Sequence, residues 1–184
     1  MTYFEELTNT KLKRPNTMVA NISSKILQIR KESIKQSLSD LNNIGHRQEY
    51  VATIDGVMYY DDSRAENVNA TWFTFENIIR PVIWIVGGDI SQTNFKELKR
   101  VAKEKVKVMI CIGTESALLK KAFQKDIKDI YQSSSLEDAI ATASLLAQED
   151  DIVLFSPACK SDDNTETYIE RGNIFTQTVK QLQK

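Results

Sequence analysis

The sequence predicts an α/β fold: a mostly parallel sheet with one antiparallel hairpin strand, helices on both faces, and a helical segment ahead of the sheet. Two observations support this prediction. From Pro81 onward, short apolar runs alternate with longer segments of helical periodicity, and repeated β-α units place parallel strands between two layers of helices. Before Pro81, the pair Asp55-Gly56 separates two strand-like runs, which predicts a tight hairpin and an antiparallel member.

The composition is that of a globular protein in water. Of the 184 residues, 41% are hydrophobic and 27% are charged, and the formal net charge is −1. A general nucleic-acid binder needs clustered cations, and no apolar run is long enough to cross a bilayer. Cys111, Cys159 and the single His46 do not have the spacing of a metal-ligand cluster. We therefore expect a cytoplasmic protein with reduced cysteines, no metal site, no nucleic-acid partner and no membrane partner.

Residues 1–45 are predicted to form a helical segment, separate from a sheet domain over 46–184. The apolar positions of its first helix recur at helical spacing: Val19, Ile22, Ile26 and Ile29. A second helix is predicted over 33–41. This amphipathic pair has no sheet of its own, so we expect it to pack on another domain or on a second copy of the chain.

The sheet domain begins with a predicted strand over 48–54. Its period-two pattern puts Tyr50, Ala52 and Ile54 on one face. The Asp55-Gly56 turn leads to a returning strand over 57–60. A helix is then expected towards Ile79, with an apolar face made of Val68, Thr71, Trp72 and Phe75.

The remaining strands and helices alternate to the end of the chain. Strands are expected over 82–86, 106–112, 127–131 and 152–155. Helices are expected over 94–104, 115–123, 135–146 and from 168 onward. For the last helix, residues 162–165 are of the types that begin helices. Gly172 is expected to interrupt that helix.

Ligand-binding residues are expected in the loops that follow the strands. The run Ser156-Pro157-Ala158-Cys159-Lys160-Ser161 is small and polar, and open α/β sheets bind ligands at the carboxyl ends of their strands. Gly87, Gly88 and Gly113 end two other strands, where small residues let a ligand approach the backbone. An ordinary strand–helix connection is the alternative. Neither GxGxxG nor GxxxxGK[ST] occurs, so a self-sufficient dinucleotide or nucleoside-triphosphate site is not expected.

Several segments, in order along the chain, together resemble the C-terminal domain of the Mur ligase family. They are His46-Arg47, Ile54-Asp55-Gly56-Val57, Asp61-Asp62-Ser63-Arg64-Ala65-Glu66-Asn67, Gly87-Gly88-Asp89, Ser156-Pro157-Ala158-Cys159-Lys160-Ser161 and Tyr168-Ile169-Glu170-Arg171-Gly172-Asn173. The set is most similar to the UDP-N-acetylmuramoyl-L-alanine:D-glutamate ligases. Residues 16–45 resemble the tail of the family's central domain.

The resemblance implies a Rossmann-like domain of an ATP-dependent ligase in peptidoglycan synthesis. In that reaction ATP phosphorylates a substrate carboxylate, and the amine of D-glutamate attacks the acyl phosphate with help from magnesium. The resemblance assigns Arg47 and Asp62 to nucleotide binding, with Arg64 at the place of a family lysine. It assigns Ser161 and Tyr168 to D-glutamate binding. We assign no catalytic residue.

The sequence departs from the family pattern in ways that predict impaired function. The family's DSKATN motif reads Asp62-Ser63-Arg64-Ala65-Glu66-Asn67, so arginine replaces lysine and glutamate replaces threonine. Arginine keeps the charge but not the compact ammonium, whereas Glu66 adds a negative charge where a carboxylate should bind. Ser91 stands where the family has a lysine after its glycines. We therefore expect D-glutamate binding to be weak or absent.

Each assigned residue also has a purely structural alternative. Arg47 would pair with Glu49 or Asp62 on the surface. Asp62 would cap the helix that begins near Asn67. Ser161 would cap the last helix, and the ring of Tyr168 would pack in the core.

Two function classes follow from these observations. The first is a ligase C-terminal domain that is inactive alone, does not bind ATP or magnesium tightly by itself, and acts with the remaining ligase domains or through self-association of its N-terminal helices. The second is a diverged, non-catalytic paralogue that serves as a protein-binding module. A stand-alone small-nucleotide binder is the weakest alternative, because no phosphate loop is present.

Overall fold

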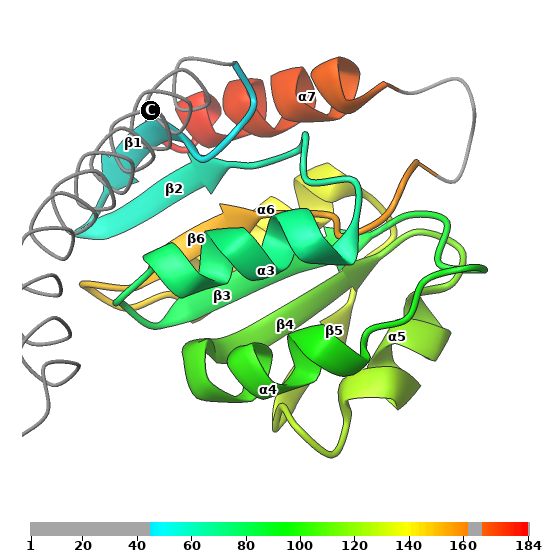
Figure 1. Cartoon of the computed structure of the whole chain (residues 1–184). Coiled ribbons are helices and arrows are strands. Elements are labelled where there is room, and N and C mark those ends of the chain that lie inside the picture. The colour runs from blue at the N-terminus through cyan, green and yellow to red at the C-terminus, as the bar shows by residue number, and fades with distance from the viewer. Residues whose placement is uncertain (1–44, 162–166, 184) are drawn as a thin grey trace, which may run out of the picture. The chain divides into compact units, whose positions relative to one another are not determined.

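The structure is a computed structural model that describes residues 45–161 and 167–183 (Figure 1). The strands are β1 (Glu49–Ile54), β2 (Val57–Asp61), β3 (Val82–Gly87), β4 (Val106–Ile112), β5 (Asp129–Gln132) and β6 (Ile152–Phe155). The helices are α3 (Val68–Asn77), α4 (Lys96–Lys105), α5 (Ser116–Phe123), α6 (Leu136–Leu146) and α7 (Tyr168–Gln181). The strands form one sheet in the order β1-β2-β6-β3-β4-β5, in which only β1 and β2 pair antiparallel. The predicted fold class is confirmed.

The sheet separates two apolar layers, because alternate residues of its buried strands point to opposite faces. On one face, Trp84 and Leu154 pack with α3, α4 and α5. On the other face, Ile85 and Phe155 pack with α6 and α7. Figure 1 shows the same division, with α3 and α4 on one side of the sheet and α6 and α7 on the other. This two-sided covering explains why β3 and β6 are apolar at almost every position.

The hairpin between β1 and β2 has the predicted turn. Asp55 and Gly56 both have positive φ, 49° and 78°, as a type I′ turn requires. The expectation that Tyr50, Ala52 and Ile54 share one face is wrong. The pairing register shifts between Tyr50 and Ala52, which indicates a β-bulge, and one extra residue reverses the side-chain alternation. Ala52 is therefore buried, whereas Tyr50 is exposed and lies edge-on to Tyr60.

Helix α3 begins where the sequence suggested but buries a narrower face. Asn67 caps it by accepting a hydrogen bond from the amide of Ala70. Its buried residues are Thr71, Thr74 and Phe75. Trp72, which was expected on the apolar face, is 36% exposed, because it lies one residue beyond the stripe that contacts the sheet.

Helix α7 passes through Gly172 without interruption, so that expectation is also wrong. Thr167 caps the helix, and its capping box with Glu170 is complete in both directions. Ser161 therefore does not cap this helix. The start predicted over 162–165 and the amphipathic helices predicted within 1–44 lie outside the described residues, and the domain boundary at residue 45 stays a prediction. None of the helices described here is long and apolar enough to span a membrane.

Candidate functional site at the carboxyl edge of the sheet

Three loops meet where β2, β6 and β3 end. Backbone hydrogen bonds join them: Asp62 to Phe155 at 2.8 Å, Ala158 to Ala65 at 2.9 Å, and Asp89 to Lys160 at 2.9 Å. The chain leaves β2 and β3 toward one face of the sheet but leaves β6 toward the other. Such a reversal opens a crevice at the carboxyl ends of parallel strands, where α/β proteins bind ligands. The structure therefore brings together most of the loops that the sequence singled out.

Asp62 lies inside this junction rather than on its surface. Its side chain is fully buried. It accepts hydrogen bonds from Thr74 Oγ1 at 2.7 Å, from Ser156 Oγ at 2.8 Å and from the backbone N–H of Gln48 at 3.2 Å. Asn67, not Asp62, caps α3, so the capping alternative is wrong. Asp62 is instead the centre of a buried hydrogen-bond network that connects the loop before β1 to α3 and to the end of β6. Direct contact between Asp62 and a nucleotide stays a prediction.

The same network determines the acidity of Asp62. Burial raises the pKa of Asp62 from 3.8 to about 6, because a carboxylate loses its hydration there. The hydrogen bonds from Thr74, Ser156 and Gln48, and the positive charge of Arg47, favour the ionised form and limit the rise. Arg47 therefore lies within electrostatic reach of Asp62, although the structure gives no direct ion pair between these two described residues.

The neighbouring Asp61 fixes the segment before β1 next to helix α7. Its Oδ2 atom lies 2.7 Å from His46 Nδ1, and the His46 ring is edge-on to Tyr168. Gly172 of α7 faces this pair: a Cβ there would overlap His46 Nδ1 and lie 2.6 Å from Asp61 Oδ2. Gly172 is therefore required by this contact. Glu49 also accepts from the His46 amide at 2.7 Å, and we interpret the cluster as hydrogen-bonded support for the loop rather than as a metal centre.

Arg64 and Tyr168, which were assigned to different ligands, contact each other. The Arg64 guanidinium carbon lies 5.2 Å from the centre of the Tyr168 ring, within the range of a cation–π interaction. Arg64 Nη1 also donates to the Tyr168 hydroxyl at 3.4 Å. Tyr168 is only half-buried, so the alternative of a core ring is wrong.

Glu66 forms an ion pair that no sequence motif indicated. Its carboxylate accepts from Arg171 Nη2 at 3.1 Å, across 105 residues of sequence. The Arg171 side chain is 5% exposed and that of Glu66 is 32% exposed. The segment Tyr168-Ile169-Glu170-Arg171-Gly172-Asn173 contained this arginine, but no local pattern indicates which acid it meets.

Two cavities open at this edge, near the isolated antiparallel bridge between Asp89 and Lys160. The larger has a volume of about 620 Å³ and is lined mainly by α3's first turn, the loop after β3 and the loop after β6, including Glu66, Ser91 and Lys160. The smaller, of about 320 Å³, includes Ser161 and Arg171. Ser161 is thus placed at a cavity, whereas Ser91 lies in the neighbouring one.

The glycines that end β3 have a structural explanation. A Cβ at Gly87 would overlap the carbonyl oxygen of Ile112, and one at Gly88 would overlap the carbonyl oxygen of Lys160. Their φ angles are also positive, 151° and 139°, which disfavours other residues. Both glycines also line the smaller cavity, so the expectation that they let a ligand approach the backbone stays a prediction.

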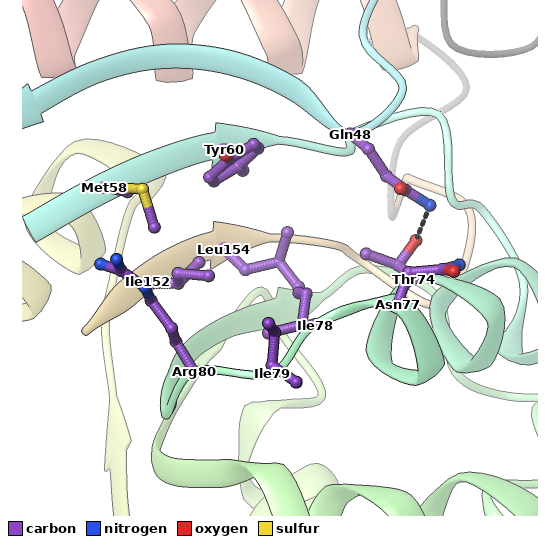
Figure 2. Close-up of a pocket in the computed structure, with 10 residues that line it drawn as sticks. All are labelled: Gln48, Met58, Tyr60, Thr74, Asn77, Ile78, Ile79, Arg80, Ile152 and Leu154. Carbon is purple, nitrogen blue, oxygen red and sulfur yellow. Dashed lines mark hydrogen bonds between the residues drawn. The ribbon is translucent and has the colours of Figure 1, made fainter. Parts of the chain in front are cut away.

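A third cavity is apolar and lies between β2, β6 and the end of α3 (Figure 2). Its volume is about 290 Å³, and Met58, Tyr60 and Ile78 are among its lining residues. Gln48 lines it too, and its side chain donates to Thr74 at 3.1 Å. Since Thr74 also bonds Asp62, the hydrogen-bonded network around Asp62 reaches this cavity.

Comparison with known proteins identifies relatives that match most of the chain. The family model for the Mur ligase, glutamate ligase domain, matches residues 46–159. UDP-N-acetylmuramoylalanine--D-glutamate ligase of Salinibacter ruber is 34% identical over 91% of this chain and 36% of its own length. The enzyme of that name from Christiangramia forsetii is 36% identical over 91% of this chain and 38% of its own length. The chain therefore spans little more than a third of these relatives.

Solved structures share the fold at low sequence identity. E. coli FolC in complex with ADP aligns with a TM-score of 0.55 and 13% identity, covering 77% of this chain and 33% of FolC. MurF ligase from Thermotoga maritima in complex with ADP aligns with a TM-score of 0.52 and 15% identity, covering 77% of this chain and 33% of MurF. Both proteins were solved with a nucleotide bound.

Proposed function

The chain belongs to the Mur ligase family, and on this basis we propose that it is the acceptor-amino-acid domain of a ligase that adds D-glutamate to UDP-N-acetylmuramoylalanine in peptidoglycan synthesis. One observation supports this most strongly: relatives with that name match 91% of the chain at 34–36% identity. The loops carrying the motifs also converge at one edge of the sheet. ATP, which the family uses, would supply the activated carboxyl group.

The proposed roles follow from position at that edge. Arg47 is half-buried near Asp62, and Arg64 is exposed beside Tyr168. We assign both arginines to the phosphate-facing side, because guanidinium groups match phosphate oxygens well. Ser161 and Tyr168 face the acceptor amino acid. Asp62 supports these groups from within through Thr74 and Ser156.

Reconstitution tests this proposal. The chain alone, given ATP, magnesium, D-glutamate and UDP-N-acetylmuramoylalanine, is expected to release no phosphate, because it contains no phosphate loop. Mixed with the remaining domains of the Christiangramia forsetii relative, it is expected to restore slow, D-glutamate-dependent release. Arg47→Ala should reduce this activity, whereas Arg100→Ala on the exposed face of α4 should not. If the chain alone releases phosphate, and Asp62→Ala abolishes that release, the expectation that the isolated chain is inactive is wrong.

A protein-binding module is the second candidate, favoured by one observation. Ile79 is 95% exposed beside the apolar cavity of Figure 2, and Trp72 is also partly exposed on α3. Exposed apolar groups beside an apolar cavity mark interaction surfaces. Sedimentation of the chain at micromolar concentration, with Ile79→Ser as the comparison, tests self-association. A monomeric chain that reconstitutes ligase activity would contradict the module.

A further inference from the structure

The backbone of residues 46–48, the loop just before β1, adopts a conformation that few side chains allow. Both neighbours of Arg47 have positive φ, 64° at His46 and 46° at Gln48. Residues other than glycine rarely adopt such angles, because the side chain then crowds its own backbone. Conformations of this kind persist only where surrounding contacts hold them, and they concentrate at ligand-binding sites. The contacts of the 46–48 loop therefore bear on its role.

Hydrogen bonds hold the first residue of the loop at its backbone and at its ring. The His46 N–H donates to Glu49 Oε2 at 2.7 Å, and the His46 carbonyl accepts from the N–H of Arg64 at 3.1 Å. The His46 ring Nδ1 lies 2.7 Å from Asp61 Oδ2. These partners belong to β1, to the end of β2 and to the segment after β2. His46 is therefore fixed by both strands of the hairpin.

The last residue of the loop is held by Asp62 and Thr74. The Gln48 N–H donates to Asp62 Oδ1 at 3.2 Å, and the side-chain Nε2 of Gln48 donates to Thr74 Oγ1 at 3.1 Å (Figure 2). Thr74 Oγ1 in turn donates to Asp62 Oδ2 at 2.7 Å, whereas the Ala70 carbonyl lies farther away, at 3.2 Å. A hydroxyl has one proton and two lone pairs, so with its proton on the carboxylate it accepts from Gln48. The Thr74 hydroxyl thus fixes both the side chain of Gln48 and the carboxylate that holds the Gln48 backbone.

Arg47 lies between these two fixed residues with its head group uncommitted. Arg47 is half-buried, and its positive charge limits the rise in the pKa of Asp62. Within residues 45–161 and 167–183, no hydrogen bond or ion pair engages the Arg47 guanidinium. A guanidinium offers its N–H donors in a planar fork that fits phosphate oxygens. The fold therefore fixes the backbone on both sides of Arg47 and leaves its donors available to an anion.

We propose that Thr74 is a positioning residue for Arg47, and that its hydroxyl holds the 46–48 loop in the conformation that presents the Arg47 guanidinium to the phosphates of a nucleotide. The inference rests on the proposed function, which places Arg47 on the phosphate-facing side, and it names the residue that puts Arg47 there. Thr74 is buried in α3, with 1% exposed, so it acts through Gln48 and Asp62 and does not touch the ligand. Because all of these contacts lie within the sheet domain, the loop is preformed in the chain alone.

The test is an NMR titration of the full chain with inorganic triphosphate, followed at the Arg47 side-chain N–H and at the backbone amides of residues 46–48. The native chain should bind triphosphate weakly, at millimolar concentration. Thr74→Val keeps the shape of the side chain but removes the hydroxyl. It should weaken binding about tenfold, which is the result when the loop occupies its binding conformation about one tenth of the time. Thr74→Ser restores the hydroxyl and should restore the native affinity. Thr53→Val is the matched control and should bind like the native chain, because Thr53 is exposed and its hydroxyl contacts Tyr50, outside this network.

A purely structural role for Thr74 predicts a different pattern. Lower stability by itself leaves the affinity of the folded chain unchanged, whereas a positioning role makes the effect depend on Arg47. In an Arg47→Ala background, Thr74→Val should therefore cause no further loss of triphosphate affinity. Gln48→Met removes the side-chain donor but keeps the backbone bond to Asp62, so it should weaken binding by only about threefold. This variant replaces Thr74→Val in the test if circular dichroism shows that Thr74→Val does not fold.

Thr74 does not position Arg47 if folded Thr74→Val binds triphosphate like the native chain, or if it loses as much affinity in the Arg47→Ala background. Native affinity in Gln48→Met has the same meaning where Thr74→Val is unfolded. If Thr74→Ser remains as weak as Thr74→Val, the hydroxyl is not the cause and the inference is wrong. If triphosphate does not shift the resonances of the native 46–48 loop, the loop is not preformed for a phosphate and the inference is wrong. The acceptor role is judged separately, by D-glutamate-dependent phosphate release in the reconstituted ligase.

Discussion

Replacing Gly172 with alanine tests whether α7 is held against the end of β2 as the structure shows. Helix propensity alone predicts that the change stabilises the protein, since glycine inside a helix is about 0.5–1 kcal/mol less favourable than alanine. The structure predicts the opposite. A Cβ at this position would lie 2.5 Å from Ser63 Oγ and 2.6 Å from Asp61 Oδ2, where ordinary contacts begin at 3.4 Å.

The magnitude follows from two costs. Overpacking of a close contact typically costs about 1–3 kcal/mol, and the atoms here belong to fully buried residues that cannot move into solvent. Displacing His46 from Asp61 would leave a buried carboxylate without that partner, which costs about 1–3 kcal/mol more. Subtracting the propensity gain leaves a net loss of about 1–5 kcal/mol in the free energy of unfolding.

Urea denaturation followed by far-ultraviolet circular dichroism measures this loss as a lower midpoint with an unchanged slope. Asn173→Ala is the matched control, because Asn173 is the exposed neighbour in the same helix, and it should be neutral or slightly stabilising. In a His46→Ala background, Gly172→Ala should cost less, since the imidazole no longer competes for the space. A Gly172→Ala protein at least as stable as the native one would refute the reasoning.

Three further predictions concern buried groups. Between about pH 4 and pH 6 the folded state binds the Asp62 proton more tightly than the unfolded state, because the folded pKa is raised from 3.8 to about 6. The free energy of unfolding of the native protein, measured relative to that of Asp62→Asn, should therefore fall as pH rises through this window. The expected fall is about 3 kcal/mol, at about 1.4 kcal/mol per pH unit. A difference between the two proteins that is constant with pH in parallel urea titrations would contradict this. Trp84→Phe should lower the free energy of unfolding by about 1–3 kcal/mol in thermal or urea unfolding, because Trp84 Nε1 donates to the buried carbonyl of Ser156 at 2.7 Å. An unchanged free energy of unfolding would mean that this carbonyl finds another donor. Cys111 and Cys159 are both buried, and burial raises the pKa of Cys111 to about 12, so a thiol-specific reagent should label neither until denaturant is added.

The sequence by itself determined those features that depend on neighbouring residues. The hairpin follows from Asp55-Gly56, because these residue types tolerate the positive φ angles that a tight turn needs. The later strands were predicted to within about two residues, because apolar runs bounded by turn residues have few other ways to bury their side chains. The ordered motifs similarly indicated the family that the relatives confirm.

The tertiary structure alone decided which distant groups meet. Glu66 reads as an added negative charge in a carboxylate site, yet Arg171 neutralises it across 105 residues. Gly172 reads as a helix breaker, yet α7 continues through it because His46, Ser63 and Asp61 fill the space beside it. Glycine in a helix costs only about 1 kcal/mol relative to alanine, so contacts of several kcal/mol made by packing and burial override it. These contacts depend on how β2, β6 and α7 pack together, and the local sequence pattern does not determine that arrangement.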